Sequence, residues 1–504
     1  MASHSSVIAK NTLFLYVRTL AIMIIAIYTS RVLLDKLGVE EFGIYNLVGG
    51  VVALFASLRG IFAQSVQRFL NFERGKGNEE KVRDIFNISL LLHIILGVLF
   101  SIIVLAFGIW YIPRYLVFPE GMLPTAMFVF YSSIAATFIT IISIPYDSAI
   151  IANEKFDFYA IVSIIDTIAR LGIIYLITCF GSDKLKTYAV LILIVTILFR
   201  LINIIYALKF SECKPKKVWD KQIFKELASF SGWNFLGNTA FSLTNEGINF
   251  VINIFGGVTA NAARGLAYHV KSAVIQLSSN IVVASRPHVT ESSASEDKQI
   301  IFGYIIKVSR LMYIAVALTI LPLIVYTDHI LNLWLVEVPE YTAIFVQLVM
   351  IQMLIRAPQA SIDLLFSSYG KMKNYQIVQS ISLFLSLPLA YILLYIGFPI
   401  YWAFISMCII EAITLAAIVI CADKELGFGL DYFMNKFLWK ALASMLQLIV
   451  IGLFFYIFIK PTSFFILLLS LVSLMIISCL DVYFFYLDKE ERMLIISLLR
   501  KIKK

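Results

Sequence analysis

Long apolar stretches, separated by short polar segments, run through the whole of this 504-residue chain. Most of the stretches reach or exceed the roughly 20 residues that an α-helix needs to cross the hydrocarbon core of a bilayer. Fourteen spans are predicted, at residues 12–34, 43–70, 86–111, 122–146, 159–180, 187–209, 227–254, 260–284, 301–326, 342–366, 375–396, 400–422, 437–459 and 463–486. We therefore expect an all-α polytopic membrane protein.

Composition agrees with this interpretation. Apolar residues make up 60% of the chain and charged residues 14%, which is far from the composition of a soluble globular protein. The longest polar gaps between spans are about 15 residues, too short for a soluble domain.

The loops differ in charge in a way that predicts orientation. With the N-terminus in the cytoplasm, the inner segments carry 25 Lys and Arg residues and the outer loops 5. Positively charged loops stay on the cytoplasmic side, so both termini are expected there. The net charge of +9 is then mostly a consequence of topology, and it predicts no nucleic-acid partner.

Three pairs of features recur along the chain at offsets of 216 to 219 residues. The pairs are Gly38-Val39 with Gly257-Val258, Arg68 and Glu73 with Arg286 and Glu291, and Lys155 and Tyr159 with Lys371 and Tyr375. Internal repeats of this kind build two lobes around a central site in many transporters. The predicted parts are an N-terminal lobe (1–210), a cytoplasmic linker (211–226), a C-terminal lobe (227–424), and a last segment (425–504) with spans 13 and 14 and a basic tail.

The predicted spans contain an excess of positive charge. Eleven cations fall inside them: Arg18, Arg31, Arg59, Arg68, Arg170, Arg200, Arg264, Lys271, Lys307, Arg310 and Arg356. Only four acids are expected at comparable depth: Asp166, Glu246, Asp363 and Glu411. Charged residues at membrane depth usually face a water-filled cavity or a partner. The excess predicts an anionic cargo.

The seventh and eighth spans are the most polar of the C-terminal half. Asn234, Asn238, Asn245 and Asn249 are spaced to share one helix face, and Arg264 and Lys271 are seven residues apart. The asparagines are expected either to line a cavity or to hydrogen-bond neighbouring helices. Among the cations, Arg59 and Lys271 lie near mid-depth, where a side chain cannot easily reach the interface.

Other buried charges have simpler explanations. The four-residue spacing of Asp166 and Arg170 predicts an intrahelical pair. Arg200, Lys307 and Arg310 are each potential partners of Glu411 or Asp363, and the sequence leaves the pairing open. Glu246 is the candidate for ion coupling, with a static salt bridge to Arg264 or Arg59 as the alternative.

Sequence motifs for catalysis and cofactor binding are missing. The chain has no phosphate-binding glycine loop, and its five histidines have no metal-ligand spacing. The five cysteines are expected to be free. We expect no enzyme activity and no cofactor.

Several local segments together resemble one family of transporters. They are RVLLDKLGVEEFGIYNLVGG (31–50), RFLNFERGKGNEEK (68–81), NEKFDFYA (153–160) and its echo YGKMKNYQ (369–376). With the fourteen spans and the buried cations, they resemble the multidrug/oligosaccharidyl-lipid/polysaccharide (MOP) flippase superfamily, and most of all its polysaccharide-transport branch, the Wzx-type O-antigen flippases.

The resemblance implies alternating access of two lobes around a central cavity in a bacterial inner membrane. It implies a cargo of oligosaccharide on a polyprenyl diphosphate, contact with membrane lipids, and association with polysaccharide assembly enzymes. Arg18, Arg31, Arg59, Arg264 and Lys271 lie on spans that line the cavity in such proteins. A lipid II-type flippase and a multidrug and toxin extrusion antiporter are the alternatives. The antiporters favour buried acids, which spans 1, 2 and 8 lack.

Overall fold

The computed structural model describes residues 4–75, 77–153, 155–177, 183–295, 298–369, 371–488 and 492. Within these ranges the side chains of 4–17, 20, 50–62, 64, 65, 68, 72, 75, 226, 228–242, 276–280, 283, 284, 286–288 and 290–295 are not described. The described chain forms helices and contains no strand, which confirms the all-α fold.

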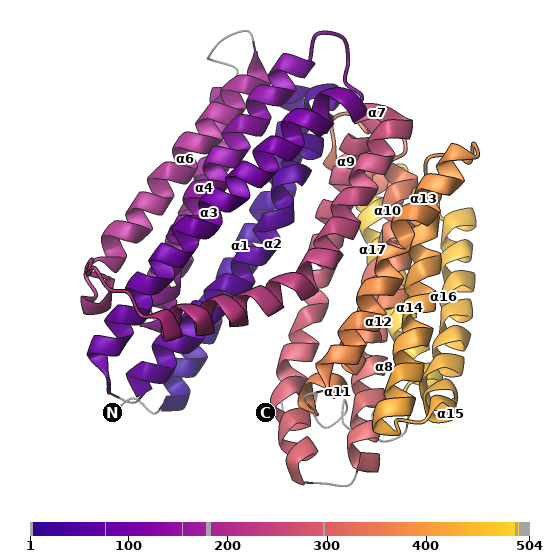
Figure 1. The fold of residues 1–504 in the computed structure, drawn as a ribbon. Coiled ribbons are helices and arrows are strands. Elements are labelled where there is room, and N and C mark those ends of the chain that lie inside the picture. The colour runs from indigo at the N-terminus through magenta and orange to yellow at the C-terminus, as the bar shows by residue number, and fades with distance from the viewer. Residues whose placement is uncertain are drawn as a thin grey trace. The chain divides into compact units, whose positions relative to one another are not determined.

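The helices follow one another with short connections (Figure 1). In the first half they are α1 (His4–Leu37), α2 (Val39–Gly75), α3 (Glu79–Tyr115), α4 (Leu123–Ala152), α5 (Phe156–Leu176), α6 (Lys184–Ala207), η1 (Ser211–Cys213) and α7 (Lys221–Ser295). In the second half they are α8 (Lys298–Val325), α9 (Thr327–Trp334), α10 (Thr342–Arg356), α11 (Gln359–Ser368), α12 (Met372–Phe384), α13 (Ser386–Tyr395), α14 (Trp402–Leu426), α15 (Leu430–Phe433), η2 (Met434–Leu438), α16 (Trp439–Phe458), α17 (Phe464–Asp481) and η3 (Val482–Tyr486).

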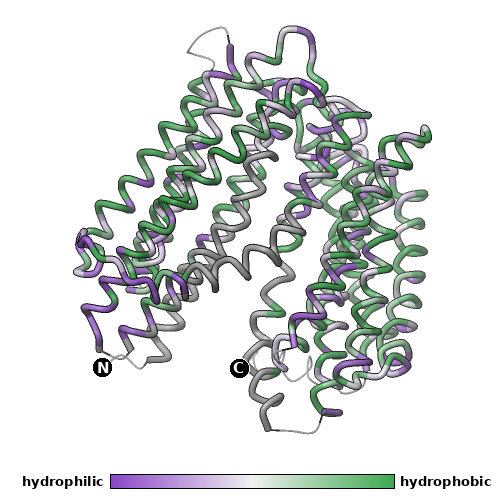
Figure 2. The backbone as a smooth tube through the Cα atoms, in the orientation of Figure 1, coloured by the Kyte–Doolittle hydropathy of each residue, from purple (hydrophilic) through white to green (hydrophobic). Residues whose placement is uncertain are grey.

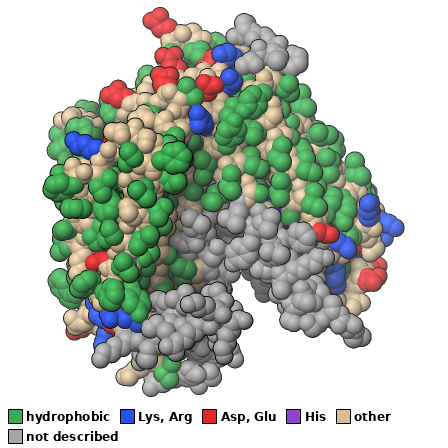
Figure 3. All heavy atoms as spheres, turned by 180° about the vertical axis from the view of Figure 1, so that it is seen from behind, with side chains coloured by type: hydrophobic (Ala, Val, Ile, Leu, Met, Phe, Trp, Pro, Cys, Tyr) green, Lys and Arg blue, Asp and Glu red, His purple; other side chains and the backbone are tan. Residues whose placement is uncertain are grey.

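Within the described residues, ten helices or joined helix pairs are long and apolar enough to cross a membrane. Spans 1 and 2 coincide with α1 and α2, and spans 7 and 8 with the two arms of α7. Hydrophobic residues dominate the middle of the helices in Figure 2. Figure 3 shows hydrophobic side chains over most of the described surface on one face, with charged side chains toward its edges. Exposed side chains such as Phe465 (79% exposed) fit contact with lipid. The protein is a multi-pass membrane protein.

Two of the predicted spans are broken by proline. Pro358 separates α10 from α11, and Pro388 follows the break between α12 and α13 at Leu385. A proline inside a helix has no N–H to donate and its ring clashes with the carbonyl four residues earlier, so the helix bends or restarts there.

The chain divides into two compact units. Unit 1 comprises Met1–Gly265 and Leu335–Glu340, and unit 2 comprises Leu266–Trp334 and Tyr341–Lys504. In unit 1, α4 packs on α2, α3 and α6, and α1 packs on α5. Figure 1 shows α3, α4 and α6 side by side. Phe86, Ile88 and Ile150 are among the fully buried residues of the unit 1 core.

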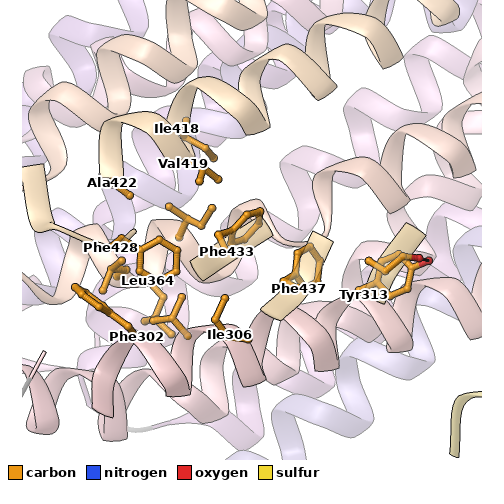
Figure 4. Close-up of a cluster of buried hydrophobic side chains, with 14 of the residues drawn as sticks. Phe302, Ile306, Tyr313, Leu364, Ile418, Val419, Ala422, Phe428, Phe433 and Phe437 are labelled. Atoms are coloured by element: carbon orange, nitrogen blue, oxygen red, sulfur yellow. Dashed lines mark hydrogen bonds between the residues drawn. The ribbon is translucent and has the colours of Figure 1, made fainter. Parts of the chain in front are cut away.

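Unit 2 is built around α8 and α14. Helices α10, α11 and α16 pack on α8, and α10, α12 and α13 pack on α14. Aromatic rings fill the core between them (Figure 4). Phe302 meets Phe428 edge to face and Phe433 meets Phe437 at a tilt, each with 5.1 Å between ring centroids. Large rings bury much apolar surface, and edge-to-face pairs add a further stabilisation.

Two of the three pairs predicted to be equivalent in the repeats share a backbone feature. Gly38 and Gly257 both have positive φ, at 81° and 63°. Lys155 and Lys371 each precede a helix, and their backbone N–H groups donate to Ile150 and Phe366 at 3.1 and 3.0 Å. In both cases the acceptor lies five residues earlier. The predicted lobe boundaries themselves remain a prediction.

Candidate functional site

A sharp turn divides α7 into two arms. Gly257 sits at the turn with φ 63° and ψ −169°, a combination that essentially only glycine adopts. The helix therefore doubles back, and the residues before the turn face those that follow it, up to Gly265, within unit 1. A helix hairpin at membrane depth needs its polar groups satisfied internally, because lipid offers no hydrogen bonds.

A ladder of asparagines joins the two arms. Asn261 donates to the side-chain oxygen of Asn249 at 2.8 Å and to its backbone carbonyl at 2.9 Å. Asn253 donates to Asn261 at 2.9 Å and accepts a hydrogen bond of 2.8 Å from the backbone of Val117, just after α3. All three asparagines are at most 1% exposed. Hydrogen bonding between helix segments, the second of the two interpretations offered above, therefore describes Asn249.

Two predicted site residues meet beside this ladder. Arg264 on the second arm is 5% exposed and donates to the backbone carbonyl of Asn245 on the first arm at 2.7 Å. Glu246 accepts a hydrogen bond of 3.2 Å from Asn249, and the positive charge of Arg264 acts on its carboxylate. The structure thus brings Asn245, Glu246, Asn249 and Arg264 together.

Close packing against α2 holds the hairpin in place. A Cβ on Gly43 would lie 2.1 Å from the carbonyl oxygen of Val258, and a Cβ on Gly265 would lie 2.7 Å from the side chain of Asn46. Only glycine leaves room for helices to approach this closely. The small residues at these two positions therefore position the α7 hairpin, and with it Arg264 and Glu246, on α2.

The cations of α1 occupy a different setting. Arg18 and Arg31 are both partly buried. The guanidinium of Arg18 lies 4.8 Å from the centroid of the Tyr159 ring on α5. Its Nε is buried and has no hydrogen-bond partner among the described residues. A guanidinium over an aromatic face keeps its full charge, because the ring attracts the cation without neutralising it.

Lys271 lies in unit 2, on the second arm of α7. Its ammonium donates to the side-chain oxygen of Gln352 at 3.2 Å and lies 4.7 Å from the Tyr268 ring centroid. Gln352 in turn donates to Glu411 at 3.2 Å. The side chains of the remaining predicted site residues, Arg59, Asn234 and Asn238, lie outside the described residues.

The structure also assigns partners to the buried charges. The predicted Asp166–Arg170 pair is confirmed at 2.9 Å. Arg200 binds Asp147 at 2.7 Å, Arg310 binds Asp488, and Arg356 lies 3.7 Å from Glu411. Glu411 therefore meets none of the three cations offered for it from the sequence.

Two expectations about burial were wrong. Asp147, which was not among the four acids expected at depth, is buried, 3% exposed, because α4 continues past Pro145 to Ala152 instead of ending at residue 146. Lys307 is exposed, so it does not belong with the buried cations. The error at Asp147 concerns a helix end, where a hydropathy window cannot follow the helix into its polar turn.

Unit 2 contains two adjoining cavities. One of about 540 Å³ lies between α8, α10, α14 and the α15–α16 segment, and one of about 320 Å³ lies between α8, α10 and α16. Tyr313, Ile351, Leu354 and Met445 line both. The larger cavity has an entirely apolar lining apart from the Tyr313 ring, which suits a hydrocarbon chain.

Known structures share this architecture. The lipid II flippase MurJ in an inward closed conformation aligns with a TM-score of 0.66 at 16% identity, covering 94% of this chain and 99% of that one. An inward-facing multidrug resistance MATE transporter aligns at 0.63 and 14% identity, covering 86% and 96%. A MOP-superfamily transporter from Pyrococcus furiosus, described as having a binding pocket of reverse polarity, aligns at 0.52 and 14%, covering 87% and 93%.

Family membership rests on the sequence. No curated protein matches this chain. The model of the polysaccharide biosynthesis protein family matches residues 8–293, more than half of the chain. The chain therefore belongs to the polysaccharide biosynthesis protein family, and its fold is that of the flippases and transporters of the MOP superfamily.

Proposed function

We propose that this protein flips an oligosaccharide linked to a polyprenyl diphosphate from the inner to the outer leaflet. The observation that carries the proposal is Arg18, a partly buried arginine on the first span whose described contact is the aromatic ring of Tyr159. A diphosphate carries the negative charge that such a cation would bind, and charge-assisted hydrogen bonds are the strongest that a transporter can offer it.

The other predicted cations differ in burial and in the contacts that they would have to exchange for the cargo. Arg31 is partly buried on the same helix as Arg18. Arg264 and Lys271 are each 5% exposed and donate to a backbone carbonyl and to an amide oxygen, so either would have to give up such a contact to bind phosphate. We place Arg18, Arg31 and Arg59 first as diphosphate ligands, with Arg264 and Lys271 supporting them.

The hydrocarbon part of the cargo has a matching feature. The larger cavity of unit 2, about 540 Å³, is lined by apolar side chains and Tyr313, which a polyprenyl chain can contact with little loss of hydrogen bonds. A cationic first span and an apolar groove fit a lipid carrying a diphosphate better than they fit a soluble cation.

Lipid II-type transport remains the alternative, since lipid II also joins a polyprenyl diphosphate to sugars. A multidrug antiporter would need an acid that can bind and release a cation. Among the described acids, Glu246 is our candidate for that role. We assign ion coupling to it if an ion gradient drives transport. Directionality can otherwise come from removal of the product at the outer face by polysaccharide assembly enzymes.

Transport in vesicles tests the proposal. The purified protein is reconstituted with a fluorescent polyprenyl-diphosphate oligosaccharide, and the fraction that reaches the opposite leaflet is followed. We expect translocation that a polyprenyl diphosphate without sugar inhibits, and no transport of lipophilic cations. Faster transport of a cationic dye than of the diphosphate lipid would overturn the proposal, and transport of lipid II alone would support the alternative cargo.

Orientation is tested separately. We propose a bacterial inner-membrane location with both termini in the cytoplasm. Reporter fusions after Lys155, Val218 and Lys371 should report the cytoplasm, and fusions near Asp183 and Glu337 the outside. A C-terminal fusion that reports the periplasm would refute an even number of spans.

A further inference from the structure

The segment that joins α6 to α7 is fixed to unit 1 by polar contacts. Glu212 in η1 is 6% exposed and accepts hydrogen bonds from Arg74 near the end of α2, at 2.5 Å, and from Asn153 just after α4, at 2.7 Å. The backbone N–H of Lys216 donates to the side chain of Asn87 on α3 at 3.0 Å. Three helices of unit 1 therefore set the path of this segment, and the side chains that it leaves exposed form a defined surface.

The first turns of α7 continue this surface with two different sides. Ile223 and Leu227 are buried and belong to the hydrophobic core of unit 1. Lys221 and Lys225 are exposed. Residues four apart lie on the same face of a helix, so the two apolar residues point into the core while the two lysines point away from it.

The segment 209–225 is strongly basic, with six lysines and two acids. Lys216 donates to Asp84 at 2.8 Å and to Glu80 at 3.2 Å, so its charge is largely matched by α3. Both acids of the segment have partners of their own: Glu212 binds Arg74, and Asp220 accepts from the first backbone N–H groups of α7. The other five lysines are exposed: Lys209, Lys214, Lys217, Lys221 and Lys225.

An exposed tryptophan lies among these lysines. Trp219 is 62% exposed, and one side of its ring packs against Phe224, with 5.1 Å between ring centroids. Tryptophan favours the boundary between membrane and water, where its ring meets lipid and its N–H meets polar groups. The segment begins where the membrane span of α6 ends, and Ile205 in the last turns of that helix is 64% exposed. Trp219 therefore lies in a segment that leaves the membrane at this boundary.

We propose that this surface, Trp219 with the five exposed lysines, binds the headgroups of anionic phospholipids. The indole lies in the interface, and the ammonium groups contact lipid phosphates. Clusters of four to eight basic residues next to a membrane span are typical of attraction to acidic lipids, and a neighbouring aromatic ring adds apolar contact. The inference goes beyond the proposed function and does not depend on the identity of the cargo.

Quenching of Trp219 fluorescence by brominated lipids tests the surface. The protein is placed in phosphatidylcholine nanodiscs that contain an increasing share of brominated phosphatidylglycerol, or of brominated phosphatidylcholine as the neutral probe. The difference between the wild type and Trp219→Phe isolates the signal of this indole. We expect phosphatidylglycerol to quench it at the lower share of lipid. Equal quenching by the two lipids would overturn the proposal. Quenching by neither lipid would also overturn it, and would indicate a soluble acidic partner for the lysines.

Salt separates attraction between charges from simple immersion of the ring. Raising sodium chloride from about 0.05 M to about 0.5 M shortens the Debye length roughly threefold. The preference of Trp219 for phosphatidylglycerol should then largely disappear, while quenching by brominated phosphatidylcholine should stay the same. A preference that survives high salt would contradict binding through the lysines.

A triple variant, Lys217→Gln with Lys221→Gln and Lys225→Gln, tests the lysines directly. Each lysine near an anionic membrane contributes roughly fivefold to binding, so half-maximal quenching of Trp219 should need a share of phosphatidylglycerol about tenfold higher or more. The three side chains are exposed, so the Tm should remain close to that of the wild type. An unchanged lipid preference in a folded triple variant would overturn the proposal.

A matched control removes the same charge from exposed positions of unit 2. Lys373→Gln, Lys424→Gln and Lys436→Gln, on α12, α14 and η2, should together leave the lipid preference of Trp219 as in the wild type. An equal loss in both triple variants would show that the lipid responds to net charge alone, and this would overturn the assignment to the α6–α7 segment. Because no cargo is present, the outcome is separate from that of any transport assay.

Discussion

Arg200 on α6 donates a hydrogen bond to Asp147 on α4 at 2.7 Å, and both side chains are buried. Asn203, one turn further along α6, donates to the other carboxylate oxygen at 2.8 Å. Both oxygens of a buried acid are thus satisfied from a single neighbouring helix. This ion pair links α6 to α4, the helix of unit 1 that packs on α2, α3 and α6.

Removal of one member of this pair should destabilise unit 1 strongly. Arg200→Ala removes the cation that binds the buried Asp147 carboxylate, a change that typically lowers the free energy of unfolding by about 3–5 kcal/mol. Thermal unfolding in detergent measures the loss. The double variant Asp147→Asn with Arg200→Gln should recover part of it, because no charge is left alone. Arg114→Ala, at an exposed position on α3, is the control and should change little.

Two glycines of α2 should respond oppositely to the same substitution. A Cβ at Gly43 would lie 2.1 Å from the Val258 carbonyl oxygen, so Gly43→Ala must push the α7 hairpin away, at a typical cost of about 1–3 kcal/mol or more. A Cβ at Gly49 meets nothing within 4 Å, and Gly49→Ala should stabilise the helix by about 0.5–1 kcal/mol. Equal Tm changes in the two variants would show that α2 and the hairpin do not pack as described.

The fold could be predicted from the sequence, because the thickness of the bilayer fixes the length of each span. The described parts of all fourteen predicted spans are helical, Gly38 and Gly257 both have positive φ, and Lys155 and Lys371 both donate to the carbonyl five residues earlier. These features depend on local rules: apolar length, glycine at positive φ, and the turn before a helix.

The contacts of the candidate site were harder to predict from the sequence. Residues that meet in the folded protein but lie far apart in the chain leave no local sequence pattern. The hydrogen bonds that join Gln352 to Lys271 and Glu411 were not predicted, because a single amide in an apolar span has no periodicity that distinguishes it. Asp147 was placed in a loop because the apolar stretch ends before it, although the helix continues. In contrast, the spacing of Asp166 and Arg170 was sufficient, because an i, i+4 pair meets on its own helix.

Arg18 should matter for transport and little for folding. If it binds the diphosphate, Arg18→Ala removes a charge-assisted contact worth about 1.5–3 kcal/mol, which corresponds to roughly a 10- to 150-fold loss of apparent affinity. Arg18→Lys should retain part of the activity, because lysine binds phosphate as a point charge without the planar fork. Translocation in vesicles as a function of lipid concentration gives the affinity. Lys186→Ala, 40% exposed at the start of α6, is the control. Normal affinity in Arg18→Ala would remove the main support for the proposed cargo.

Asp488, just beyond the last described span, should make the protein sensitive to acid. Partial burial acts to raise the pKa of its carboxyl, but hydrogen bonds from Lys440 and Arg310 outweigh this and hold the pKa below its usual value of 3.8. Arg310 is 3% exposed on α8, and its guanidinium binds this carboxylate.

The sign of the pH dependence follows from the direction of that shift. A carboxyl whose pKa is lower in the folded state stabilises the protein at any pH above its unfolded value, and this stabilisation is lost as the pH falls through the folded value. Asp488→Asn should therefore lower the Tm at neutral pH by an amount that stays constant down to about pH 5 and shrinks below about pH 4. Because the side chain of Asp488 is 52% exposed, solvent and salt should keep the effect modest. Asp431→Asn, at an exposed position of α15, should leave the pH profile unchanged. If Asp488→Asn and the wild type differ by the same amount at pH 3.5 and pH 7, the Arg310–Asp488 contact does not stabilise the folded protein through its charge.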